Sequence, residues 1–466
     1  MTNLLKLVAM PAGLWPSRVR TLQSSLLPRN SNRFRRLTIG ALAAAALMAP
    51  TQISLAQSLP TEQAARSQSF VNMAGVVTHL TYANTAYTNN WPQVLSALQS
   101  LGVHHIRDGY FDPNDYPQFV QEHQALAASG IRTTYVMPYD PSISDNSIEQ
   151  LAYQAGDMDA IEGPNECDVL GQCGGGGSTG IANGVAMLPN LQVAAQDLSV
   201  PLVAPALVLW GSAAIAGNED QWVNLNSEHL YFGGRNPGSP GWGSYDAQGN
   251  SYGSFAFWLD QAAINTPGLP SEIGETGYMS FPSTSTPYTV PESVTASYIP
   301  RTMLLAFKHG YDKTFFYQLI DDPTSPQGYG LLRPDFSQKP GFIALQNLLS
   351  LLSDPNPSWN SSSPGALPFQ IVGGDSNVNH LLLEKSDGSF WLAIWLEEPS
   401  WDPVNAVLLP VTPENIAIQL PNGYTTTTDY QFNNTGNFTA FNQPTIGGFA
   451  SLTVTDQVSI IQIVPQ

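Results

Sequence analysis

The chain has 466 residues, of which 42% are hydrophobic and 11% are charged, with 17 Lys and Arg against 36 Asp and Glu. This length exceeds what a single hydrophobic core usually serves, so we expect more than one folded unit, and the apolar content excludes a largely disordered chain. The formal charge of −19 opposes binding to nucleic acid and to anionic membranes.

The first 56 residues are typical of an export signal. Residues 1–36 hold seven basic residues and no acidic one, and an apolar run from Leu37 to Met48 leads to Ser54-Leu55-Ala56, after which we expect cleavage. Arg35-Arg36 resembles a twin-arginine signal. Without this segment ten basic residues face 36 acidic ones, a formal charge of −26. We therefore expect a secreted or periplasmic protein with no stable membrane association, and an uncleaved anchor is the alternative.

From residue 75 onward, short apolar or β-branched runs alternate with longer amphipathic stretches. The expected strands are 75–82, 104–108, 132–139, 158–166, 201–209, 227–232, 269–275 and 313–321. The expected helices are 91–101, 115–129, 147–155, 185–198, 255–264, 292–309 and 341–353. Eight alternating units over about 280 residues predict an α/β fold, a (β/α)8 TIM barrel over 57–354. A doubly wound open sheet is the alternative.

After Asp354 the pattern changes. Residues 355–367 are rich in Pro, Ser and Asn, a linker composition, and alternating runs at 380–384, 390–397, 415–420 and 458–464 follow. Together they predict an antiparallel β-sandwich accessory domain over 355–466. Its tryptophans Trp391, Trp395 and Trp401 either contact carbohydrate or only pack.

Two strand ends of the predicted barrel carry glutamates. Strand four ends in Ile161-Glu162-Gly163-Pro164-Asn165-Glu166-Cys167-Asp168, and strand seven runs through Ser271-Glu272-Ile273-Gly274-Glu275-Thr276-Gly277-Tyr278. In such barrels the reactive groups lie at the C-terminal strand ends. A pair of carboxyl groups facing each other across a substrate is what glycoside hydrolysis requires, one as proton donor and one as nucleophile.

The only cysteines, Cys167 and Cys173, follow the first of these motifs. In an exported protein, two close cysteines predict a disulfide, and two free thiols are the alternative. No set of histidines completes a zinc site, so we expect no metal and no cofactor.

The Asn-Glu pair on strand four and the Glu-x-Gly on strand seven resemble the signature of the retaining glycoside hydrolases of clan A. The resemblance implies that Glu166 is the acid/base, that Asn165 bonds the sugar 2-hydroxyl, and that the strand-seven glutamate is the nucleophile. Glu275-Thr276-Gly277-Tyr278 is similar to the motif of clan β-1,3-glucanases, which favours Glu275, and Glu272 is the second candidate. Glu275 is expected to be ionised beside Arg107, and Glu166 to be protonated.

Further rim residues fit substrate binding in the same resemblance, and each also has a purely structural interpretation as an ion pair, a core histidine or a packing aromatic. They are Arg107, Asp108, His79, Tyr82, Trp210, His229, Tyr231 and Tyr317. Tyr317 stands where the clan usually has Trp.

The resemblance implies an enzyme, a retaining O-glycosyl hydrolase that cleaves β-linked oligo- or polysaccharides, such as a β-glucan or β-xylan, through a covalent glycosyl-enzyme. A transglycosylase would use the same residues. A barrel that only binds polysaccharide is the alternative from another class, and it would have no need of paired carboxyl groups.

Overall fold

The structure is a computed structural model that describes residues 58–322, 327–356 and 363–466. The expected export signal, residues 1–56, lies outside the described residues, as does part of the expected linker. Among the helices in these ranges, none is long and apolar enough to cross a membrane.

Eight parallel strands form one sheet in the order β7-β6-β5-β4-β3-β12-β9-β8. The strands are β3 (Ala74–Val77), β4 (His105–Gly109), β5 (Arg132–Val136), β6 (Met158–Glu162), β7 (Leu202–Val203), β8 (Asn226–His229), β9 (Ser271–Thr276) and β12 (Thr314–Phe316). Parallel bridges Val203–Leu225 and Leu207–Glu228 join the two ends of this order and close it into a ring. The predicted barrel is confirmed.

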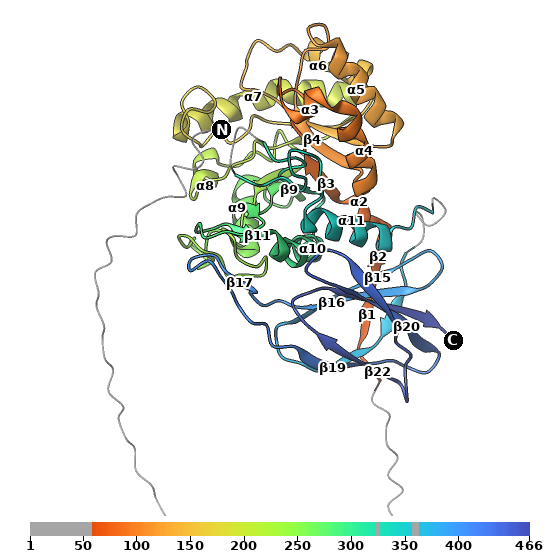
Figure 1. The fold of residues 1–466 in the computed structure, drawn as a ribbon. Helices are drawn as coiled ribbons and strands as arrows, with labels where there is room; N and C mark the ends of the chain where they lie inside the picture. The colour runs from red at the N-terminus through yellow and green to blue at the C-terminus, as the bar shows by residue number, and fades with distance from the viewer. Residues whose placement is uncertain (1–57, 323–326, 357–362) are drawn as a thin grey trace, which may run out of the picture. The chain divides into compact units, whose positions relative to one another are not determined.

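Helices surround the sheet in the upper part of Figure 1. Their bounds are α2 (Ser67–Asn72), α3 (Ala86–Asn89), α4 (Trp91–Leu101), α5 (Pro117–Ala128), α6 (Asp145–Ala155), α7 (Gly177–Leu198), α8 (Ser212–Ala216), α9 (Phe255–Asn265), α10 (Glu292–Lys308) and α11 (Pro340–Leu352). Local signals fix several ends. Ser144 caps α6 by accepting a hydrogen bond from the Ser147 N–H, and Gly102 ends α4 in the left-handed conformation.

Most barrel strands are shorter than the sequence predicts, and β6 shows why. The ladder stops at Glu162 because Pro164 has no N–H to donate and Gly163 packs so tightly on Pro205 that a Cβ would lie 2.6 Å from its Cγ. The chain then turns, so Glu166 stands beyond the strand rather than in it. The apolar runs in the sequence extend beyond the hydrogen-bonded strands because the first loop residues after the strands are also buried.

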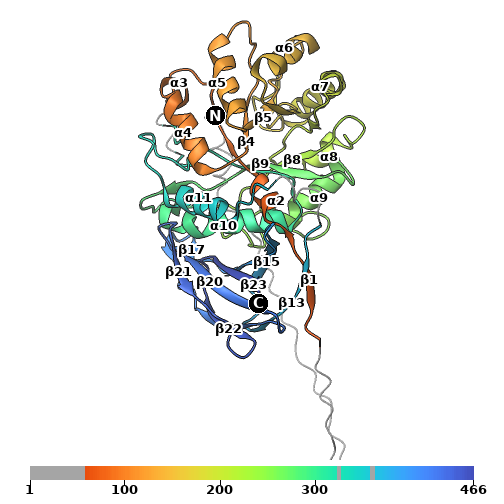
Figure 2. The same cartoon turned by 90° about the vertical axis from the view of Figure 1, so that its right-hand side faces the viewer.

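The C-terminal part is a β-sandwich of two antiparallel-rich sheets (Figures 1 and 2). One sheet holds β14 (Gln370–Gly373), β19 (Glu414–Gln419) and β22 (Phe449–Val454). The other holds β2 (Ala65–Arg66), β15 (Val378–Glu384), β16 (Phe390–Leu396), β23 (Ser459–Pro465), β20 (Tyr424–Phe432) and β21 (Phe438–Asn442). Three short pairs complete the strands: β1 (Thr61–Gln63) with β13 (Ala366–Pro368), β10 (Ser280–Phe281) with β11 (Val290–Pro291), and β17 (Trp401–Asp402) with β18 (Val407–Leu408).

The chain enters the sandwich before it enters the barrel. β1 pairs with β13, and β2 pairs in parallel with β15, as Figure 2 lets the reader follow for β1 and β13. The sequence-based boundaries 57–354 and 355–466 remain predictions. By pairing, β2 belongs to the six-stranded sandwich sheet, and β1 forms a separate pair with β13 of the C-terminal part.

A buried glutamate of the sandwich joins the two parts. Glu397, which follows β16, forms an ion pair with Arg301 of α10. It also accepts hydrogen bonds from the Asn236 side chain at 2.8 Å and the Gly238 N–H at 2.9 Å, both in the loop after β8. The three sandwich tryptophans are buried, with exposures of 6% for Trp391, 0% for Trp395 and 3% for Trp401, so they pack and do not present a carbohydrate surface.

Candidate active site

The two glutamates expected to face each other do meet. Glu166 and Glu275 are 4% and 8% exposed, and one carboxyl oxygen of each lies within 4.8 Å of the other and of a His229 ring nitrogen. β9 carries Glu275, whereas Glu166 is held by the turn after β6, where its φ of 45° is left-handed and its N–H donates to the Ala206 carbonyl at 3.0 Å. A non-glycine residue in this conformation is uncommon and concentrates at functional sites.

His229, the last residue of β8, lies between the two carboxyl groups. Its Nδ1 is 2.8 Å from Glu166 Oε1, a hydrogen bond, and 3.6 Å from Glu275 Oε2. Burial lowers the pKa of His229, and the nearby Glu275 only partly opposes this. A neutral imidazole therefore holds Glu166 without adding a positive charge to the pair.

Arg107 on β4 binds three partners. Its Nη1 donates to Glu275 Oε1 at 2.8 Å, and its Nη2 donates to Asn165 Oδ1 at 2.7 Å. Nε and Nη2 also donate to the two oxygens of Glu162 at 2.6 and 2.9 Å. Because β4 is not a sheet neighbour of β6 or β9, these contacts cross the barrel interior.

Glu275 has a third partner. The Tyr231 hydroxyl, two residues beyond β8, donates to Glu275 Oε2 at 2.8 Å. Both oxygens of Glu275 are thus hydrogen-bonded, which orients the carboxylate. Glu272, the second candidate, is fully buried in the barrel, where its nearest cation is Lys313 at 3.9 Å, and burial raises its pKa to about 8. Glu275, not Glu272, shares the site with Glu166.

Glu166 has a raised pKa. Burial, followed by the charge of Asp168, raises its pKa to about 7, against a partial lowering by Arg107. The neighbouring carboxylate with this effect is Asp168 rather than Glu275. Asp168 in turn accepts the N–H groups of Val208 and Leu209 at 2.9 and 2.7 Å, which ties the turn to the chain after β7.

The predicted disulfide is present. Cys167 and Cys173 are joined, and they close a loop that begins directly after Glu166. The loop packs on α7, where a Cβ at Gly184 would lie 2.8 Å from Cys167 Sγ. The bond therefore braces the turn that carries Glu166.

Asp108 and Trp210, two of the predicted rim residues, have different surroundings from those of Arg107. Asp108 faces the loop after β3, where it accepts hydrogen bonds from Thr78 Oγ1 at 2.5 Å and from the Leu80 N–H at 2.9 Å. Arg107 and Asp108 do not pair with each other in the described structure. Trp210 lies beyond β7 with 55% of its surface exposed.

Aromatic side chains line the site next to Glu275. His79 stacks on Tyr82 with ring centroids 4.4 Å apart and meets Tyr317 edge-on at 5.6 Å. Tyr329 lies between Tyr317 and Tyr231, with centroids 5.6 Å from each. Burial and the charge of Arg107 lower the pKa of His79 to about 3. These rings offer flat apolar faces of the kind that sugars stack on.

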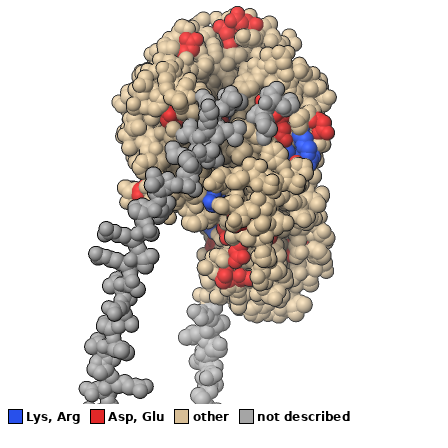
Figure 3. All heavy atoms as spheres, turned by 60° about the vertical axis from the view of Figure 1, so that its left-hand side comes forward, with Lys and Arg blue, Asp and Glu red and all other residues tan. Residues whose placement is uncertain are grey.

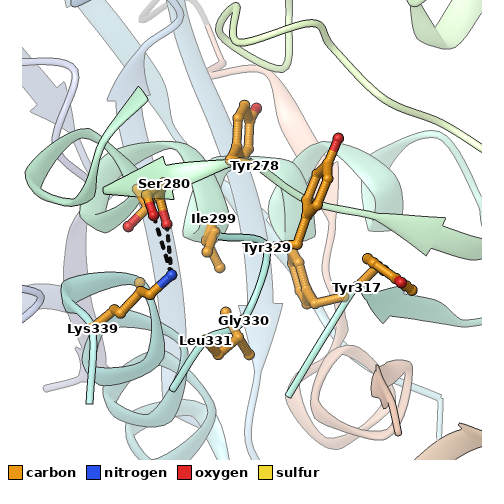
Figure 4. A pocket seen from close by; sticks show the side chains of 12 residues that line it. Tyr278, Ser280, Ile299, Tyr317, Tyr329, Gly330, Leu331 and Lys339 are labelled. Carbon is orange, nitrogen blue, oxygen red and sulfur yellow. Dashed lines mark hydrogen bonds between the residues drawn. The ribbon is translucent and has the colours of Figure 1, made fainter. Parts of the chain in front are cut away.

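Tyr317 and Tyr329 also line a small cavity, and the contacts around this cavity show how Tyr329 is held (Figure 4). The buried Lys339 donates to Ser280 O and Oγ at 3.2 and 3.3 Å and to Gly328 O at 3.0 Å. Its ammonium also lies 2.7 Å from Asp321. Lys339 thereby fixes the loop on which Tyr329 stands.

Sequence reasoning missed Glu162 and Tyr329. Glu162 was visible as a carboxyl group at the inward end of an apolar strand, four residues before Glu166. Tyr329 was visible as a tyrosine between two glycines in the loop after strand eight.

Glu166, His229 and Glu275 also have the spacing of three metal ligands. Arg107 and Tyr231 already use both Glu275 oxygens, so the set fits hydrogen-bonded acid–base chemistry better.

The fold and the site define a (β/α)8 barrel with a β-sandwich and paired carboxyl groups at its strand ends. No family model and no curated protein matches the sequence. Solved structures do match. The catalytic domain of GH30 xylanase C from Talaromyces cellulolyticus is 13% identical, covering 87% of this chain and 98% of its own, with a TM-score of 0.50.

Two further structures are similar. A glucosidase from Croceicoccus marinus is 12% identical over 87% of this chain and 97% of its own, with a TM-score of 0.56. An α-L-arabinofuranosidase from Thermotoga maritima is 12% identical over 88% and 98%, with a TM-score of 0.55. At these identities the likeness establishes the shared fold.

Proposed function

We propose that the chain is a retaining O-glycosyl hydrolase that cleaves β-linked glycans by double displacement. The observation that carries this is the approach of Glu166 and Glu275 to within 4.8 Å between carboxyl oxygens. Retaining enzymes hold the two carboxyl groups about 5 to 5.5 Å apart, whereas inverting enzymes need about 6.5 to 9.5 Å to fit a water. The short separation supports a nucleophile and a proton donor with no water between them.

The environments of the two carboxyl groups support different roles. Glu275 accepts hydrogen bonds from Arg107 and Tyr231, which orient both oxygens of the carboxyl group proposed to attack the anomeric carbon. Glu166, with its pKa raised to about 7, carries the proton for the leaving oxygen. Asn165, whose Oδ1 is taken by Arg107, is left with its Nδ2 donor for the sugar 2-hydroxyl.

We infer a neutral glycan as the substrate. The formal charge is −19, and the face in Figure 3 is mostly uncharged with separate acidic patches, which would repel a polyanion. Aromatic rings around the site, including Tyr82 and Tyr317, suit the apolar faces of gluco- or xylo-configured sugars. The disulfide supports action outside the cytoplasm, in keeping with the expected export signal.

A substrate screen tests the function. Purified protein would be assayed on β-glucans, β-xylans and aryl β-glycosides, beside Glu275→Ala and the control Glu228→Gln, a buried glutamate on β8 that bonds Tyr311. We expect release of sugar by the wild type and by E228Q, and a loss of at least about 10⁴-fold in E275A. Equal activity of E275A and the wild type, or no activity on any glycan, would contradict the proposal. Longer products in place of free sugar would indicate transglycosylation by the same residues.

A further inference from the structure

We propose that Glu162 is a positioning residue that acts through Arg107 on both the nucleophile and the 2-hydroxyl partner. This inference rests on the proposed function. Glu162 touches neither Glu166 nor Glu275 directly, and no role in the reaction follows from its own position. Its effect depends on which atoms of Arg107 it occupies.

Glu162 is the last residue of β6 and is 0% exposed. Its oxygens receive Arg107 Nε at 2.6 Å and Nη2 at 2.9 Å, a two-bond fork, and Oε1 also accepts the Ser227 hydroxyl at 3.1 Å. Gly274 leaves space for the Ser227 hydroxyl, because a Cβ at Gly274 would lie 2.4 Å from Ser227 Oγ. The same Cβ would lie 3.5 Å from Arg107 Nε. Such a fork fixes a guanidinium in plane and in rotation.

With one edge of the guanidinium fixed, the other N–H groups have set directions. Nη1 points to Glu275 Oε1, and the second Nη2 hydrogen points to Asn165 Oδ1. The bond to Oδ1 fixes the orientation of the Asn165 amide. Its NH₂ group therefore faces away from Arg107 and is available as a donor for the sugar 2-hydroxyl. One buried anchor thus orients the attacking carboxylate and the donor for the sugar hydroxyl together.

Charge gives the anchor a second effect. Burial alone would lower the pKa of Arg107, but the carboxylates of Glu162 and Glu275 raise it, so the guanidinium stays charged. Glu162 offsets part of that charge. Without it, Glu275 would be the main counter-ion of a buried cation and would be bound more tightly in the ground state than in the transition state, where its charge passes to the new bond.

The test compares Glu162→Gln with the wild type and with Glu228→Gln as a matched buried carboxyl control. Each would be assayed on an aryl β-glycoside that the wild type cleaves and on its 2-deoxy analogue. We expect E162Q to lower kcat about 10- to 100-fold with KM within about twofold, as a small misplacement of reacting groups does. We also expect the ratio of kcat/KM between parent and 2-deoxy substrate to shrink at least about fivefold, because Asn165 is no longer held. E228Q should match the wild type in both.

Ser227→Ala, which removes one hydrogen bond to Glu162 without changing its charge, serves if E162Q does not fold. It should shift kcat and the 2-hydroxyl ratio in the same directions, by about two- to fivefold. An unchanged 2-hydroxyl ratio in the folded variant, whatever its kcat, would overturn the inference. If the wild type is active and E275A is not, an unchanged 2-hydroxyl ratio overturns only the role of Glu162 and leaves the proposed function intact. If the wild type cleaves no glycoside, the proposed function and this inference fail together.

Discussion

At the scale of single residues, the site separates two chemically identical side chains by their neighbours. Glu275 is surrounded by donors, Arg107 and Tyr231, whereas Glu166 is buried beside a neutral His229 and close to the carboxylate of Asp168. Donors stabilise the charged form of a carboxyl group, and burial stabilises the neutral form. The same two effects support the proposed roles of Glu275 as nucleophile and Glu166 as proton donor.

The pH dependence of activity should report Glu166. Its pKa is raised to about 7, and a general acid works only while protonated, so kcat/KM on a glycan should fall as the pH rises through about 7. Glu166→Ala should remove this alkaline limb and slow glycan cleavage, yet spare bond cleavage in a dinitrophenyl glycoside, whose leaving group needs no proton. Sugar release from the glycan at several pH values follows the alkaline limb, and pre-steady-state release of dinitrophenol measures the spared bond cleavage. An alkaline limb that persists in E166A would assign the titration to another group.

How far the site is predictable depends on where each residue stands. Asn165, Glu166 and Glu275 could be predicted because strand ends in a parallel barrel meet at one rim, and their spacing resembles a known pattern. The motif that begins at Glu275 already favours it over Glu272, and the structure adds a register shift between β8 and β9 that skips Gly274. Tyr329 was harder to predict, since a tyrosine between two glycines marks a loop but does not show that anchors such as Lys339 bring that loop to the site.

At the scale of elements, the sandwich holds a loop of the barrel rim. Glu397 binds Arg301 of α10 and also Asn236 and Gly238, in the loop that follows Tyr231. Burial alone would raise the pKa of Glu397, but Arg301 lowers it, so the carboxylate stays ionised. A chain truncated near Asp354 would lack Glu397. Arg301 would then lose its counter-ion, and Asn236 and Gly238 would lose a hydrogen-bond acceptor.

Glu397→Gln should therefore destabilise the protein by about 3 kcal/mol, since it leaves Arg301 as a buried cation without its partner. The matched control is Glu398→Gln, whose side chain bonds only within the sandwich in the described contacts, to Asn377. Urea unfolding monitored by Trp fluorescence gives both free energies, and limited proteolysis locates the loosened segment. Equal stability of the two variants, or cleavage away from residues 233–240, would contradict the role of Glu397.

Elements were easier to predict than their pairing. Helix α4 has the predicted bounds, because Pro92 and Gly102 mark its ends in the sequence. β1 and β2, in contrast, were included in the barrel segment, since nothing in six residues indicates that their partners lie 300 residues further on. Long-range strand pairing depends on the whole sheet and leaves little trace in a local pattern.

At the scale of the whole molecule, the protein buries several carboxyl groups to which no cation is bonded among the residues that the structure describes. Glu228, which accepts Tyr311 Oη–H at 2.7 Å, has its pKa raised to about 8 by burial, and Glu219 likewise to about 8. In the folded state these groups keep protons that the unfolded chain releases above about pH 4.5. The contribution of these two groups to stability therefore falls as the pH rises from about 4.5 to 8.

Glu228→Gln should reduce this loss, because the amide cannot ionise. The free energy of unfolding of the wild type should fall between pH 5 and pH 8, and that of E228Q should fall less. Urea titrations at the two pH values measure both differences. A fall of equal size in the two proteins would show that Glu228 does not keep its proton in the folded state.

The central claim is that Glu166 and Glu275 act as a retaining pair, and the configuration of the first product tests it most directly. Proton NMR during hydrolysis of an aryl β-glycoside resolves the anomeric signal before mutarotation. With carboxyl oxygens within 4.8 Å, double displacement predicts that the β-anomer appears first and the α-anomer only later. An α-anomer formed first would mean a single displacement by water and would contradict the account.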